Sequence, residues 1–269
     1  MIGQKKLLDK ISNIDSLDKI SKSIIIQGNK GSGRHTFIKE LFGKFSLEIL
    51  DVDFELSVDD IYSTSIPKVY LIDIDKLGEE RRIERFQNTI LKFLEEPPMF
   101  AWVVIITEDI ESLLYTIRNR CQIYKILPYS LEELREISAL YNKNYTDTVL
   151  KILKTPGNII TKDISQLNDI FDLARNIVKS IGNATPANAL SIRDKFIRDE
   201  NQLDLDVFIN IILDEFYIAY REYNYDEKYF EAYLLTTKFK KDLRVIGINK
   251  KYIIDNYLIS LKDIYARYS

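Results

Sequence analysis

The sequence is poor in the residue types that build disulfides and cysteine-based metal sites. Its 269 residues include one cysteine, Cys121, and one histidine, His35. A disulfide within the chain needs two cysteines, and a structural zinc site needs about four Cys or His ligands, so we expect neither a disulfide nor zinc. A lone free cysteine also fits a reducing compartment.

Long apolar runs and a basic excess are missing as well. No apolar run approaches the roughly 20 residues that cross a bilayer, and the first residues lack the apolar core of a signal peptide. The net charge is −3, whereas a protein that binds DNA alone usually carries a positive excess. We therefore expect a cytoplasmic protein without membrane contact, whose nucleic-acid contacts are local or shared with partner subunits.

Short apolar runs in the first half of the chain predict a parallel β-sheet. Five such runs, several of them rich in β-branched residues, recur with amphipathic stretches between them, at residues 24–26, 47–52, 69–72, 102–106 and 122–126. Runs this short and apolar are typical of strands buried on both faces, and the helical stretches between them indicate βαβ units. The expected fold class is α/β, with helices on both faces of a parallel sheet.

The pattern becomes helical after residue 128. Ser130 and Glu133 form a capping box, which predicts the start of a helix. From residue 162 onward we find only helical periodicity. We predict an α/β domain over residues 1–128, a small helical piece over 129–165 and an all-helical domain over 166–269.

A glycine-rich loop lies between the first predicted strand and the next predicted helix. Its G-x-x-G-x-G spacing is that of a phosphate-binding Walker A loop, whose backbone N–H groups surround phosphate oxygens at a helix N-terminus. The candidate binding residues are Gly28, Gly31, Ser32, Gly33, Arg34, His35 and Thr36. Two positions depart from the motif, because Arg34 replaces the lysine and His35 replaces the Ser or Thr that binds magnesium, with Thr36 one place later.

Three interpretations of this altered loop stay open. The loop hydrolyses ATP with magnesium, or binds ATP or another anion without turnover, or is an inherited turn that binds nothing. Arginine keeps the positive charge of lysine but not its compact ammonium group, and imidazole is a poor magnesium ligand. The two departures argue against hydrolysis, whereas the surviving glycines favour binding of phosphate groups.

A second acidic motif follows the third predicted strand. Asp73 ends the apolar run and has the position of a Walker B carboxylate, which holds the water shell of a magnesium ion. Ile74 stands where a glutamate would polarise the attacking water, and Asp75 reaches that place only if the strand end bulges. The alternative is a carboxylate that only keeps the strand end soluble. Two motifs altered in the same sense favour a chain that does not hydrolyse ATP.

Two further segments carry a family resemblance. They are LKFLEEPP at residues 91–98 and TIRNRCQ at residues 116–122. The chain resembles the AAA+ clamp-loader subunits of bacterial DNA polymerase III, of the gamma/tau and delta-prime types, whose signature is a helix ending L-L-K-x-L-E-E-P-P followed by a T-I-x-S-R-C segment. Asn119 replaces the serine of that signature, and the opening Ile2-Gly3-Gln4 is similar to the family's first motif.

The resemblance implies an AAA+ fold, with residues 129–165 as the lid and 166–269 as the collar of an oligomer. It implies an ATP-driven complex that opens a sliding clamp and places it on primed DNA. The implied partners are other clamp-loader subunits, the sliding clamp and primer–template DNA. By position Arg120 is the trans-acting arginine finger of the family, which reaches the ATP site of a neighbouring subunit. Arg118 is the alternative, and a plain surface arginine is the other interpretation.

Delta-prime subunits of this family combine a degenerate ATP site with a retained finger, and this chain has the same combination. It departs from the family in lacking the four-cysteine zinc module, in its short length and in having no clear lid arginine, with Lys162 as the nearest candidate. A compact, diverged subunit is the leading hypothesis. A catalytically active clamp-loader ATPase, or a stand-alone P-loop protein of DNA repair or regulation, stays as an alternative.

Overall fold

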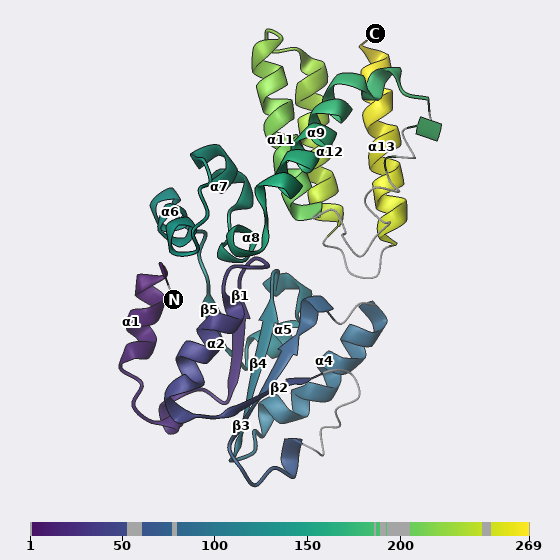
Figure 1. The fold of residues 1–269 in the computed structure, drawn as a ribbon. Helices are drawn as coiled ribbons and strands as arrows, with labels where there is room; N and C mark the ends of the chain where they lie inside the picture. Colours follow the sequence, from purple (N-terminus) through teal and green to yellow (C-terminus); the bar gives the residue numbers. More distant parts are fainter. Residues whose placement is uncertain are drawn as a thin grey trace. The chain divides into compact units, whose positions relative to one another are not determined.

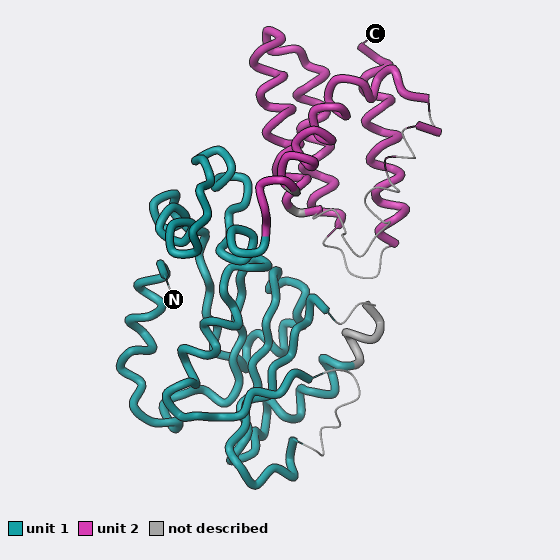
Figure 2. Tube along the Cα trace, in the orientation of Figure 1, with its two compact units in different colours: residues 1–161 teal, residues 162–269 magenta. Residues whose placement is uncertain are grey.

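The chain folds into two compact units, residues 1–161 and residues 162–269 (Figure 2). A computed structural model describes residues 2–52, 61–76, 80–185, 187, 188, 192, 205–243 and 249–268. Each unit buries its own set of apolar side chains, and each is described by itself below.

Five parallel strands form one sheet in the first unit, in the spatial order β2-β3-β4-β1-β5. The strands are β1 (Ser23–Gln27), β2 (Glu48–Val52), β3 (Lys68–Asp73), β4 (Ala101–Thr107) and β5 (Gln122–Lys125). Each of the five predicted runs lies on one of these strands, so the predicted parallel sheet is confirmed. β4 is buried over its whole length, because strands flank it on both sides and helices cover both faces of the sheet.

Helices lie on both sides of the sheet (Figure 1). α1 (Lys5–Ser12) and α2 (Arg34–Phe42) pack on one face, where their apolar residues join every second residue of the strands in one cluster. α4 (Glu80–Glu95) lies on the opposite side of the strands, and α5 (Tyr115–Arg118) contacts it. α4 ends just before Pro97 and Pro98, because proline has no N–H to continue a helix.

The carboxyl ends of the five parallel strands meet at one edge of the sheet. The glycine-rich loop follows β1, and the short helix η3 (Ile74–Lys76) follows β3. The other short helices of this unit are η1 (Leu17–Lys19), η2 (Gly43–Phe45) and η4 (Ile110–Ser112). The topology therefore brings the loop, the predicted Walker B residue and the end of β4 to the same edge.

Three helices complete the first unit: α6 (Leu131–Leu140), α7 (Asp147–Leu153) and α8 (Pro156–Thr161). The predicted capping box is confirmed, because the Glu133 N–H donates to Ser130 Oγ at 3.2 Å and the Ser130 N–H donates to Glu133 Oε2 at 2.7 Å. These helices belong to the same compact unit as the sheet. The predicted division into an α/β domain and a separate lid stays a prediction.

The second unit is helical throughout the residues that the structure describes. Its main helices are α9 (Ile164–Ser180), α11 (Leu205–Glu222), α12 (Glu227–Asp242) and α13 (Lys250–Arg267), with η5 (Ile181–Asn183) after α9. α12 and α13 meet in the core, where Tyr257 stacks on Phe239 at 4.1 Å between ring centroids and its hydroxyl pairs with Thr236 Oγ1 at 2.9 Å. Within the described ranges, no helix is both long and apolar enough to span a membrane.

Candidate functional site

The glycine-rich loop connects β1 to α2, as the sequence predicts. The Gly28 N–H donates to the carbonyl of Thr107 at the end of β4, at 3.1 Å. Gly31 and Gly33 have φ angles of +76° and +96°, a region that residues with a Cβ atom rarely adopt. Gly33 is the N-cap of α2, so the loop turns directly into a helix N-terminus. The shape of a phosphate-binding loop is therefore kept.

Arg34 is bound within its own subunit rather than extended toward solvent. Its side chain is 7% exposed, and its Nη1 lies 2.5 Å from Asp75 Oδ2. Asp75 also accepts hydrogen bonds from Thr107 Oγ1 at 3.2 Å and from the Glu108 N–H at 3.0 Å. The short helix η3 turns the chain after β3 and brings Asp75 to the loop. The charge that a phosphate-binding lysine would offer is thus neutralised by a neighbouring carboxylate.

Asp73 ends β3 and is buried beside the same edge. Its Oδ2 lies 3.3 Å from Lys76 Nζ. The other oxygen, Oδ1, is buried and has no hydrogen-bond partner within the described part of the chain, and the same is true of Ser32 Oγ in the loop. His35 and Thr36 lie in the first turn of α2. Arg34 therefore forms its ion pair with Asp75, whereas Asp73 forms one with Lys76.

The imidazole of His35 has a lowered pKa. Partial burial is the main cause, and the charge of Lys76 adds to it, while Asp73 opposes both. Since the native state binds this proton less readily than the unfolded chain, the contribution to stability is complete above the ordinary pKa and is lost as the pH falls below it. At neutral pH the ring is therefore uncharged and adds nothing to phosphate binding through its charge.

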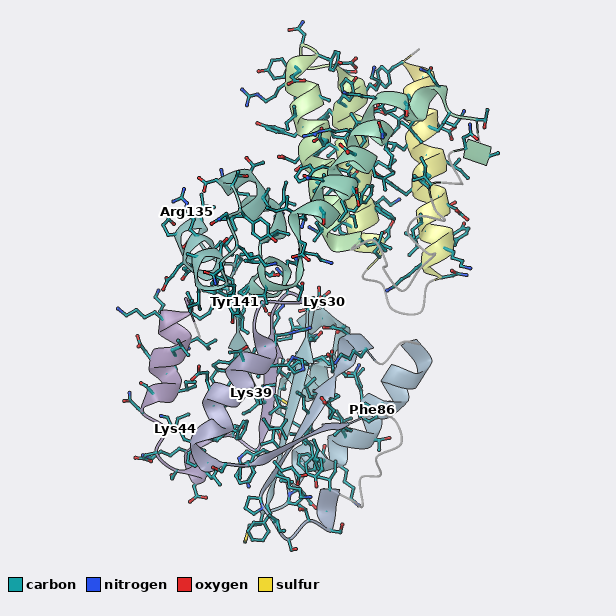
Figure 3. The ribbon with its side chains drawn as sticks, in the orientation of Figure 1. Lys30, Lys39, Lys44, Phe86, Arg135 and Tyr141 are labelled. Atoms are coloured by element: carbon teal, nitrogen blue, oxygen red, sulfur yellow. The ribbon has the colours of Figure 1, made fainter. Side chains whose placement is uncertain are left out.

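A proton NMR titration measures this pKa directly, because His35 is the only histidine of the chain. We expect a pKa below the ordinary value of about 6.5. Lys76→Ala should move it back toward that value, because it removes a nearby positive charge. Lys44→Ala, at the opposite end of α2 (Figure 3), is the control and should leave the pKa unchanged. A wild-type pKa at or above the ordinary value contradicts the assignment.

Neighbouring elements close around the glycine-rich loop. The Gly157 N–H, from the start of α8, donates to the Gly31 carbonyl at 2.8 Å. The Tyr129 hydroxyl donates to the Ser32 carbonyl at 2.8 Å, and burial raises the pKa of Tyr129 to about 12. Lys30 lies where the loop faces α6–α8 (Figure 3), and its N–H donates to Glu108 Oε1 at 3.2 Å. Groups of the protein itself therefore take up several of the loop's polar atoms.

The group that the resemblance to AAA+ clamp-loader subunits implies is a magnesium nucleoside triphosphate. The glycines and the unpartnered Ser32 Oγ suit a phosphate, but the groups that supply positive charge and magnesium ligands do not. Arg34 is already paired with Asp75, and His35 stands at the position of the magnesium ligand. The residues present do not fit a magnesium triphosphate, and we derive no catalytic step at this loop.

Arg120 lies on the surface of the first unit, just after α5. Its side chain is 36% exposed, with Nη2 2.7 Å from Glu95 Oε1 and Nη1 donating to the Thr116 carbonyl at 2.9 Å. Glu95 belongs to the LEEPP segment, so the two segments that carry the family resemblance meet in this ion pair. Arg118 is more buried and binds Glu111 at 2.6 Å. Of the two candidates, Arg120 has the more exposed side chain.

Cys121 is partly buried beside Arg120, and burial raises the pKa of its thiol to about 12. A thiol with this pKa stays protonated at neutral pH, so it is a weak nucleophile.

Glu95, Glu108 and Gly157 are site residues that sequence reasoning did not select. Each gains its place through a contact with a residue distant in sequence; Glu95 lies in the LKFLEEPP segment, but that motif did not indicate its contact with Arg120. Asp75 had a weaker signal, because the sequence offered it as a substitute for the missing glutamate if the strand end bulged. The structure instead pairs β3 regularly through Asp73, and the short helix η3 brings Asp75 to Arg34.

Comparisons with known proteins find similar sequences and a similar fold. The sequence model of the family described as "DNA polymerase III, delta subunit" matches residues 57–130. DNA polymerase III subunit gamma of Buchnera aphidicola subsp. Schizaphis graminum is 28% identical over 218 residues, which cover 65% of this chain and 59% of that protein. Subunit delta-prime of the same organism is 27% identical over 175 residues, covering 64% of this chain and 49% of that protein. The chain thus spans about half the length of the curated relatives that it matches.

A solved structure shares the fold. A single-residue variant of RuvB from Thermotoga maritima superposes with a TM-score of 0.53 at 15% identity, covering 84% of this chain and 96% of that one. This likeness concerns the fold alone, and it agrees with the predicted α/β fold, which has a parallel sheet and a helical C-terminal part. The sequence matches show that the chain is similar to the gamma and delta-prime subunits of DNA polymerase III from Buchnera aphidicola.

Proposed function

We propose that the chain is a delta-prime-like subunit of a clamp loader, which does not hydrolyse ATP itself and supplies Arg120 to the ATP site of a neighbouring subunit. In this role it works in the cytoplasm with other loader subunits, a sliding clamp and primer–template DNA. ATP, with magnesium, belongs to the neighbour in this proposal. The gamma and delta-prime relatives support the assembly, and the altered loop supports the absence of turnover.

The observation that carries the proposal is the exposed guanidinium of Arg120. It lies within the residues that the family model matches, and it takes no part in the glycine-rich loop of its own subunit. A guanidinium stays charged at every physiological pH and binds two phosphate oxygens at once, so it can stabilise the charge that develops in phosphoryl transfer. The pair with Glu95 is a surface ion pair of low stability, which phosphate oxygens can replace.

Reconstitution tests this function. The chain is mixed with the gamma-type ATPase subunit of the same organism, with and without the sliding clamp and primed DNA. We expect a stable complex by size-exclusion chromatography and a higher ATP turnover than that of the gamma-type subunit alone. The chain alone should not hydrolyse ATP. Magnesium-dependent turnover by the chain alone that is lost in Asp73→Ala would instead support the active ATPase, and failure to form any complex would support a stand-alone protein.

A further inference from the structure

Two carboxylates from neighbouring strand ends contact the glycine-rich loop. Asp75, from the turn after β3, lies 2.5 Å from the Arg34 guanidinium. Glu108, just after β4, accepts from the Lys30 N–H at 3.2 Å. The two residues are joined to each other, because the Glu108 N–H donates to both Asp75 oxygens, at 3.1 and 3.0 Å. We call Asp75 and Glu108 the carboxylate pair.

The carboxylate pair takes the interactions that phosphates would need. A phosphate at such a loop is held by backbone N–H groups and by one cationic side chain. Here one such N–H, that of Lys30, and the cation, Arg34, each already have a carboxylate partner. Two negative charges at the loop also repel the several negative charges of a triphosphate, and this repulsion is strong where Arg34 is buried away from water.

The loop nevertheless keeps the shape for an anion. Gly31 and Gly33 keep their positive φ angles, and α2 begins directly after Gly33. The hydroxyl of Ser32 is buried, on a residue that is 4% exposed, and has no partner within the residues that the structure describes. A buried hydroxyl without a hydrogen-bond partner is uncommon in a native protein, and it marks a place where a polar ligand would fit.

We propose that the carboxylate pair excludes nucleoside polyphosphates from the loop, and that neutralising it uncovers a polyphosphate site built from the loop's N–H groups, Ser32 and Arg34. Asp75 and Glu108 are then specificity-determining residues, since they decide whether the loop accepts an anion. The inference does not depend on the role proposed for Arg120, because it concerns only the chain's own loop.

The test is isothermal titration calorimetry of the full chain with ATP, once with EDTA and once with magnesium. We expect no saturable binding by the wild-type chain up to millimolar ATP. The double variant Asp75→Asn with Glu108→Gln keeps the size of both side chains, and it should bind at least tenfold more tightly than the wild-type limit. Adding Arg34→Ala to that variant should abolish the gain, because it removes the freed cation.

A matched control separates this effect from a general change of charge. The double variant Asp15→Asn with Glu48→Gln removes two negative charges from exposed ion pairs elsewhere in the same unit and should gain no binding. Circular dichroism checks the folding of every variant. If the Asp75 variant does not fold, Glu108→Gln alone still removes one of the two negative charges at the loop and should bind more tightly than the wild type. ATP binding by the wild-type chain, an equal gain in the control, or no gain in the folded variants each overturns the proposal.

Discussion

Replacing Arg120 by alanine should lower the ATP turnover of the reconstituted complex by about 1,000-fold, the lower end of the range known for arginine fingers. In the proposed role the expected loss falls on the neighbouring subunit's turnover rate, because the guanidinium would stabilise charge that exists only in the transition state. Folding should be unaffected, since the substitution removes only a surface ion pair with Glu95. The measurement is steady-state ATP hydrolysis by a complex whose assembly is checked by size-exclusion chromatography.

Three variants make this experiment specific. Arg120→Lys keeps the charge but loses the planar fork, so it should restore only a small part of the turnover. Arg118→Ala tests the second candidate and should have little effect. Arg135→Ala is the matched control, because Arg135 on α6 (Figure 3) is also exposed and bound to a carboxylate, that of Asp147. A large loss with Arg118→Ala and none with Arg120→Ala would assign the arginine-finger role to Arg118 instead. Equal turnover in all variants would show that neither arginine acts as a finger.

The sequence was informative where structure depends on neighbours along the chain. The five strands follow from runs of β-branched residues, the end of α4 from Pro97, and the start of α6 from the capping pair of Ser130 and Glu133. These signals act within one turn or one strand, so their consequences can be read without the fold. The position of the glycine-rich loop between β1 and α2 is of the same kind.

The contacts around the glycine-rich loop and Arg120 join residues that are distant in the sequence. Arg34 meets Asp75 across 41 residues, Lys30 meets Glu108 across 78, and Arg120 meets Glu95 across 25. Each depends on how parallel strand ends meet at one edge or how α4 lies beside the segment after α5. Motif positions pointed to Asp73 as the acidic partner of the loop, whereas the η3 turn brings Asp75 to Arg34 instead. Asp73 as a magnesium-holding residue stays a prediction.

Placing a methyl group on Gly157 should detach α8 from the glycine-rich loop. A Cβ atom at Gly157 would lie 2.6 Å from Gly31 Cα and 3.1 Å from the Gly31 carbonyl oxygen. These are backbone atoms, and the Gly157 N–H is bonded to that same carbonyl, so neither segment can move without losing the hydrogen bond. Gly157→Ala should therefore destabilise this part of the unit by about 1–3 kcal/mol, the usual cost of overpacking.

Two measurements identify where that loss falls. Trp102, the only tryptophan, is buried in β4, so its fluorescence in urea follows the unfolding of the first unit. Hydrogen exchange should show faster opening of α7 and α8 than of β4, because the strain acts where α8 meets the loop. Gly43→Ala is the control, since a Cβ there would meet no atom within 4 Å and its φ is −60°. That substitution should be neutral or stabilise by up to about 1 kcal/mol, because alanine restricts the unfolded chain. Equal effects of the two substitutions would mean that the close approach of Gly31 and Gly157 does not hold α8 against the loop.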